Sequence, residues 1–244
     1  MAILACSLFA SNHAVAEDAS AALSPDAVYD SFPTYSGTDL GLTVADGHAR
    51  FRLWSPKASA VRLYIYDNAN TSTPSETIEM QPADGGTWTA SLSPVPYGKF
   101  YTFSIQQDGK WLAETPGIWA KAVGVNGHRA AIIDFAATDP EGWKADKGPA
   151  TKAITDAVLY EMHHRDFSVH PSSGITNKGK FLALTEQATR SILGDKTGID
   201  HLKELGVTHV HILPSYDYNS VDETQAPLNQ YNWGYDPQNY NVPE

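Results

Sequence analysis

The residues best suited to chemistry lie in one run of seven, Tyr231-Asn232-Trp233-Gly234-Tyr235-Asp236-Pro237. Three aromatic rings, an amide and a carboxylate surround a glycine and a proline. Flat aromatic faces stack on sugar rings, and short polar side chains hydrogen-bond sugar hydroxyls. The run therefore predicts a loop that can bind carbohydrate.

A second cluster of reactive side chains lies earlier, around residues 160–170. His163, His164, Asp166 and His170 are residue types that bind metal ions. Their spacing fits no standard zinc signature, and adjacent residues on a strand point to opposite faces. The pattern therefore disfavours a metal site. Arg165 and Asp166 are interpreted as an ion pair that holds a loop at a strand's end.

Composition restricts the partners of this chain. Its 28 acidic and 17 basic residues give a formal net charge of −11, which argues against nucleic acid or an anionic membrane as a partner. A neutral ligand suits this charge. A length of 244 residues permits one large domain or two ordinary ones.

The beginning of the chain predicts export. An apolar run, Ile3 to Ala10, precedes the small-residue cleavage site Ala14-Val15-Ala16. The basic residues that usually open such a signal are absent. Cys6 also lies in a sequence like a bacterial lipoprotein box, so attachment to a membrane is expected only if Cys6 is lipidated. Otherwise we expect a periplasmic, cell-surface or secreted bacterial protein.

Alternating hydrophobic residues predict β-structure from Gly41 to Phe135. In Ala60–Asp67, alternate residues are aliphatic, the period expected of a strand with one buried face. Turn signals such as Asp46-Gly47 and Asp108-Gly109 separate the runs. Similar runs are Ala49–Trp54, Thr87–Leu92, Phe100–Ile105 and Ala130–Phe135. Several short strands with turns between them predict a β-sandwich.

The pattern changes after a polar stretch at residues 137–153. Residues 157–160 form a continuous apolar run, typical of a strand covered on both faces. Thr197 to Leu205 predicts a short helix, with Thr197 and Asp200 as a capping box. Residues 207–214 predict the next strand. Strand, helix, strand is the opening of a (β/α)8 barrel, of which about 90 residues are present against the roughly 250 that the fold needs.

The run at 231–237 resembles the YNWGYDP signature of type I pullulanases, in the alpha-amylase superfamily (glycoside hydrolase family 13). The resemblance implies that Tyr235 stacks on the glucose at the subsite of bond cleavage. Asp236 then hydrogen-bonds the same sugar, while Asn232 and Trp233 shape the loop.

Other segments resemble the same superfamily. Residues 51–56, 60–61, 86–88 and 101–103 resemble carbohydrate-binding module family 48, an immunoglobulin-like sandwich, and residues 121–127 resemble the segment that closes it. Residues 160–168, which include His163, Arg165 and Asp166, resemble the first barrel strand. Residues 206–218 resemble the second strand and its loop, in which Tyr216 and Asp217 are candidate active-site residues. Trp88 and Trp111 are the candidate sugar contacts on the sandwich.

The resemblance also implies what this chain does not contain. Retaining glycosidases use two carboxyl groups about 5–5.5 Å apart, and the family carries them on its fourth and fifth barrel strands. Glu161, Asp166 and Asp236 match neither position. We therefore expect no catalytic residue in this chain. We expect it to be the N-terminal part of an enzyme that hydrolyses α-1,6-glucosidic bonds, and to be inactive alone.

The expected partners are α-glucans such as pullulan, starch or glycogen, bound by a monomer without a metal; calcium remains open. The alternatives are a noncatalytic glycan-binding protein, an isoamylase or a branching enzyme. The predicted organisation is a signal at 1–16, a linker at 17–38, a sandwich at 39–136, a linker at 137–153 and an incomplete barrel at 154–244.

Overall fold

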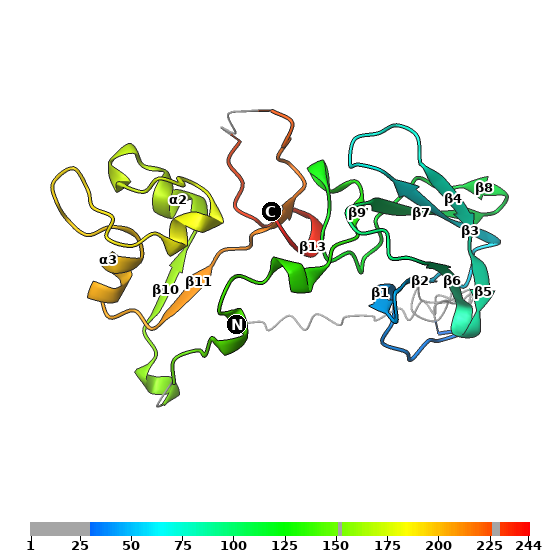
Figure 1. Cartoon of the computed structure of the whole chain (residues 1–244), viewed down its shortest axis with the longest axis horizontal. Helices are drawn as coiled ribbons and strands as arrows, with labels where there is room; N and C mark the ends of the chain where they lie inside the picture. Colours follow the sequence, from blue (N-terminus) through cyan, green and yellow to red (C-terminus); the bar gives the residue numbers. More distant parts are fainter. Residues whose placement is uncertain (1–29, 151–152, 226–229) are drawn as a thin grey trace, which may run out of the picture.

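The structure is a computed structural model that describes residues 30–150, 153–225 and 230–244. The expected export signal, Cys6 and most of the linker that follows lie outside these residues. A β-sandwich occupies one end of an elongated molecule, a small strand–helix unit occupies the other, and strand β13 lies between them (Figure 1). Within the described ranges, no helix has the length and apolar character needed to cross a membrane.

The sandwich consists of two antiparallel sheets. The first has the order β1 (Gly41–Ala45), β2 (His48–Trp54), β6 (Thr87–Leu92) and β5 (Gln81–Ala83). The second has the order β4 (Glu76–Glu79), β3 (Ala60–Tyr66), β7 (Phe100–Gln107) and β8 (Lys110–Trp111), and β9 (Ala130–Ala131) also pairs with β7.

The alternation in β3 produces the core of the sandwich. Val61, Leu63 and Ile65 are all buried, because alternate side chains of a strand point to the same face. They pack with the aromatic residues Phe51 and Phe103 in one hydrophobic cluster. The predicted strands at 49–54, 60–67, 87–92 and 100–105 are confirmed, and so is the buried face predicted for 60–67. The predicted strand at 130–135 is wrong beyond Ala131, because residues 135–138 form a 3-10 turn.

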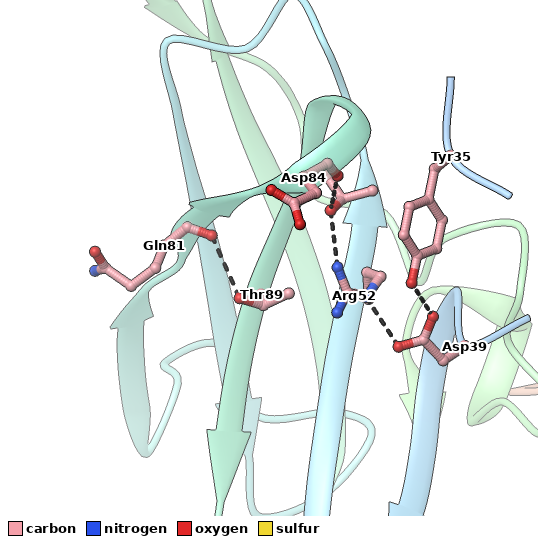
Figure 2. A network of polar contacts seen from close by, with 7 residues as sticks. Tyr35, Asp39, Arg52, Gln81, Asp84 and Thr89 are labelled. Carbon is pink, nitrogen blue, oxygen red and sulfur yellow. Dashed lines mark hydrogen bonds and ion pairs between the residues drawn. The ribbon is translucent and has the colours of Figure 1, made fainter. Parts of the chain in front are cut away.

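A polar network fixes the segment that precedes the sandwich (Figure 2). Arg52 on β2 donates to Asp39 at 2.9 Å and to the hydroxyl of Thr87 at 3.0 Å. The Tyr35 hydroxyl donates to the same Asp39 carboxylate. The hydrogen bond from Tyr35, followed by those from Arg52, lowers the pKa of Asp39. Residues 35–39 are therefore attached to the sheet.

The second unit contains two parallel strands and two short helices. Strand β10 (Leu159–Met162) pairs in parallel with β11 (His209–Ile212), and α2 (His164–Val169) and α3 (Gly198–Glu204) lie in the connection. The predicted helix and second strand are confirmed. Closure of these elements into a barrel stays a prediction.

Three local expectations for this unit are wrong. Leu159 is 70% exposed, because no described element covers that face of the two-stranded sheet, so the strand is not buried on both faces. Thr197 makes no side-chain cap; its hydroxyl donates to the Ser173 carbonyl instead, and Asp200 accepts from the amide of Ala188. Residues 164–169 are helical rather than a continuation of the strand.

A fourth sheet, which the sequence did not predict, brackets the YNWGYDP run. Strand β12 (Tyr216–Tyr218) pairs antiparallel with β13 (Pro237–Pro243), and Tyr218 lies opposite Pro237. The remaining elements are short 3-10 turns: η1 (Asp84–Gly86), η2 (Val125–Gly127), η3 (Phe135–Thr138), η4 (Trp143–Ala145), η5 (Ile154–Asp156), η6 (Pro171–Ser173) and η7 (Phe181–Thr185).

Candidate functional site

The loop at residues 231–237 is organised around the buried side chain of Asn232. Its Nδ2 donates to Ser220 Oγ at 2.7 Å and to Asp236 Oδ1 at 2.6 Å. Its Oδ1 accepts from the backbone N–H of Gly234 at 2.6 Å. An amide is required here, because only an amide donates twice from one atom and accepts at the other. The loop-shaping role of Asn232 stays a prediction, and these three hydrogen bonds are the contacts through which it would act.

The backbone of the loop is held by His163, at the end of β10. His163 Nε2 lies 2.7 Å from the carbonyl oxygen of Asn232, which can only accept, so Nε2 carries the proton. The ring of Tyr231 lies 5.4 Å from that of His163. Strand β10 is thereby joined to the loop.

The expectation that His163 and His164 point to opposite faces is wrong. Their rings stack at 5.4 Å with planes 8° apart, because His164 begins helix α2 instead of continuing the strand. Burial, and then the neighbouring His163, lowers the pKa of His164, which favours its neutral form. Among the described residues, no group of three or more His, Cys, Asp or Glu side chains is placed to hold a metal ion.

Trp233 and Tyr235 are the two most exposed aromatic residues of the loop. Trp233 is 60% exposed and Tyr235 is 68% exposed, whereas Gly234 between them is buried. Gly234 has φ +88°, and a Cβ at this position would overlap the carbonyl oxygen of Pro214. The glycine therefore lets the backbone pack closely while its two neighbours project outward.

Asp236 adds a charged acceptor to the exposed rings. Hydrogen bonds from Ser220, and then from Asn232, lower its pKa, so the carboxylate is ionised at neutral pH. An ionised carboxylate beside an exposed tyrosine can accept hydrogen bonds from sugar hydroxyls.

The structure places Arg165 and Asp166 in helix α2 rather than at the strand's end. Arg165 Nη1 lies 3.0 Å from Asp166 Oδ1, and the guanidinium lies 5.8 Å from the centre of the Tyr231 ring. An exposed ion pair of this kind contributes little stability, so its effect is to orient the guanidinium toward Tyr231.

Tyr216 and Asp217 connect β12 to β13. The Tyr216 ring faces that of Tyr240 at 6.1 Å, and Asp217 Oδ2 accepts from Asn239 Nδ2 at 2.8 Å. Burial raises the pKa of Asp217. Sequence reasoning missed Ser220 and Asn239, since neither carries a local signal until β12 and β13 are paired.

We expect Glu244, whose carboxylate accepts from the amide of Tyr218 on β12, to make the pairing of β12 and β13 depend on pH. Burial, and then repulsion from Glu223 and Asp217, raises its pKa to about 7 from the usual 4.5. An acid whose folded pKa is raised contributes stability at low pH that is lost as pH rises through the folded value. The loss should reach on the order of 1–2 kcal/mol after screening by solvent.

We expect Glu244→Gln to raise the melting temperature at pH 8 and to leave it nearly unchanged at pH 4.5. Glutamine still accepts from the amide of Tyr218, which lies 2.7 Å from the carboxylate. Thermal unfolding at both pH values tests this, with the exposed Glu141→Gln as the control. Equal shifts at the two pH values would contradict the assignment.

Known proteins resemble this chain over nearly all of its length. Residues 39–127 match the family Carbohydrate-binding module 48 (Isoamylase N-terminal domain). A pullulanase of Bacillus subtilis is 38% identical over 89% of this chain and 29% of its own length.

Solved structures agree with the sequence match. A pullulanase of Paenibacillus barengoltzii, in complex with maltohexaose and alpha-cyclodextrin, is 48% identical with a TM-score of 0.85. It matches 90% of this chain and 34% of its own chain. A pullulanase of Anoxybacillus, complexed with maltotriose, is 37% identical with a TM-score of 0.79, over 89% of this chain and 30% of its own.

The chain thus spans about a third of the length of these relatives. It is similar to part of these pullulanases, and its residues 39–127 match the carbohydrate-binding module 48 family.

Proposed function

We propose that this chain is the N-terminal part of a debranching enzyme that hydrolyses α-1,6-glucosidic bonds in pullulan, starch or glycogen. The observation that carries the proposal is the pair of exposed rings, Trp233 and Tyr235, on a loop fixed by Asn232. Pullulanases with similar structures form complexes with maltohexaose, maltotriose or maltotetraose, which supports an α-glucan as the ligand.

In this proposal Tyr235 and Asp236 have separate roles in binding one sugar. The face of Tyr235 stacks on a glucose ring, and the Asp236 carboxylate accepts hydrogen bonds from hydroxyls of the same sugar. Stacking on a rigid ring also favours a distorted sugar on the way to an oxocarbenium-like transition state. Trp233 and Asn232 give the loop its shape.

We infer that the chain alone does not hydrolyse glycans and that β10, α3 and β11 open a (β/α)8 barrel in the complete enzyme. Glu161 pairs with His211 at 3.0 Å, and Asp166 pairs with Arg165 at 3.0 Å. The retaining mechanism needs an acid and a nucleophile that face one sugar from about 5–5.5 Å apart. Incubating the purified chain with pullulan should release no reducing sugar; release would contradict the inference.

A second candidate is a glycan-binding protein that acts through the sandwich alone, favoured by the family match at residues 39–127. The two candidate sugar contacts on the sandwich, Trp88 and Trp111, are both partly covered by other residues. Trp88 packs against the core and donates to the Ser55 carbonyl, while the Arg62 guanidinium lies 4.1 Å from the centre of the Trp111 ring.

Affinity electrophoresis in gels containing amylopectin separates the two candidates. We expect the wild-type chain to be retarded and Tyr235→Ala to migrate as in a gel without glycan. Undiminished retardation of Tyr235→Ala would place binding on the sandwich instead.

We further propose that the protein is exported and acts as a monomer. Residues 14–16 provide the cleavage site, so the mature chain would begin at Glu17. N-terminal sequencing of the exported protein tests cleavage after Ala16. A lipid-modified Cys6 at the N-terminus would contradict this cleavage and would show that the protein is anchored to a membrane.

A further inference from the structure

We propose that Asn126 and Gly127, at the end of the sandwich, are positioning residues that hold the 231–237 loop in its binding shape. The inference concerns which contacts fix the loop, and its bearing on catalysis rests on the function proposed above. Both residues lie in η2 (Val125–Gly127), which contacts β12 and β13.

Asn126 makes a three-point contact with residues nearly one hundred positions later. Its backbone N–H donates to Glu223 Oε2, and its Oδ1 accepts from the Glu223 N–H at 2.8 Å. Its Nδ2 donates to Asp222 Oδ1 at 3.1 Å. Hydrogen bonds from Thr224, and then from Asn126, hold the pKa of Asp222 well below its usual range. The contact thus requires an amide that donates and accepts together.

The contacted residues lead directly to the start of the loop. The Asp222 N–H donates to Gln230 Oε1 at 2.8 Å, and Gln230 Nε2 donates back to the Asp222 carbonyl at 3.1 Å. Gln230 immediately precedes Tyr231. The entrance to the loop is therefore joined to Asn126 through one intermediate residue.

The exit from the loop is joined to the same turn. Asn239, on β13 just beyond Pro237, donates through Nδ2 to the Gly127 carbonyl at 2.9 Å and to Asp217 Oδ2 at 2.8 Å. Consecutive residues of η2 therefore hold the two flanks of the loop. The sandwich acts in this view as a support for the sugar site as well as a module of its own.

Gly127 shows how closely the two parts fit. It is buried with φ +68°, and a Cβ would overlap Asp217 Oδ2 and lie 2.5 Å from Asn239 Nδ2. Gly109, in the turn before β8, has a similar φ of +73° but nothing within 4 Å of its Cβ position. The two glycines share the backbone strain of an alanine substitution and differ in the contact.

The test compares Gly127→Ala, Gly109→Ala and Asn126→Asp in the whole chain by hydrogen exchange of individual amides. Asn126→Asp adds no bulk but places a carboxylate against Asp222 and Glu223. We expect the Asn219, Asp222 and Gly234 amides to exchange at least about tenfold faster in Gly127→Ala and Asn126→Asp than in wild type. In Gly109→Ala these three amides should exchange as in wild type. The amides of the paired strands β3 and β7 should stay protected in all three variants.

The same samples are titrated with maltotriose to separate this inference from the proposed function. A weaker affinity in both junction variants, with an intact sandwich, is the expected result, and 0.5 M salt should partly reverse the Asn126→Asp effect. Wild-type exchange at the loop in Asn126→Asp would overturn the inference, whatever Gly127→Ala does to the sandwich. If the loop loosens but the wild type binds no maltotriose, the proposed function fails while the positioning contact stands.

Discussion

Tyr235→Ala should weaken binding of maltotriose by about 10- to 100-fold, since burying an aromatic face contributes roughly 1.5–3 kcal/mol. The ring is 68% exposed, so its removal leaves the protein core intact. The melting temperature should therefore change little while the affinity falls. Isothermal titration of the two proteins with maltotriose measures the difference.

Tyr240 provides a matched control for this substitution. It is 67% exposed and lies on β13, outside the 231–237 run. Tyr240→Ala should bind maltotriose like the wild type, and Tyr235→Phe should retain most of the affinity because it keeps the ring. Equal losses of affinity for maltotriose in Tyr235→Ala and Tyr240→Ala would show that any exposed tyrosine contributes to binding, and that the loop has no special role.

Phe103→Ala should destabilise the sandwich by about 3–5 kcal/mol, because it removes a ring from a closely packed core. The Phe103 side chain is 1% exposed, and its ring contacts those of Phe51 and Tyr101 edge to face, at 6.4 and 5.5 Å. Removing the ring leaves a cavity and eliminates both of these ring contacts. Chemical denaturation followed by far-ultraviolet circular dichroism measures the change.

Phe135→Ala is the control for the core substitution. The side chain of Phe135 is half exposed, so it has far less contact to lose. We expect a change below about 1 kcal/mol. A Phe103→Ala protein as stable as Phe135→Ala would mean that the sandwich core described here is wrong.

The sandwich could be predicted from the sequence because its signals are local. Val61, Leu63 and Ile65 alternate over five residues, and the pair Asp108-Gly109 closes a hairpin directly. Each strand therefore reveals its buried face within its own length. The helix at 198–204 is predictable for the same reason, since Ile199, Leu202 and Leu205 share one face of a helix.

The contacts that could not be predicted join distant residues. Thr197 was expected to cap its own helix, but its hydroxyl donates to Ser173, 24 positions earlier. His163 and His164 were assigned to a strand because the apolar run before them does not show where the strand ends. In each case a tertiary contact overrides a sound local preference.

In the candidate site, too, local features could be predicted and contacts between distant residues could not. The residue types at 231–237 marked the loop and its exposed rings, whereas nothing in the run indicated that Asn232 is held by Ser220 and His163. The junction at Asn126 was equally hidden, since its partners lie 96 and 97 positions away. These partners are far apart in the sequence, so no local pattern reveals them.

The most direct test is a titration of the ¹⁵N-labelled chain with maltotriose, followed by nuclear magnetic resonance. We expect saturable shifts of the Trp233 indole N–H and of the Gly234 and Tyr235 amides, with the amides of β3 and β7 unmoved. Shifts confined to the sandwich, or none at these three residues, would contradict the claim that the 231–237 loop binds α-glucan.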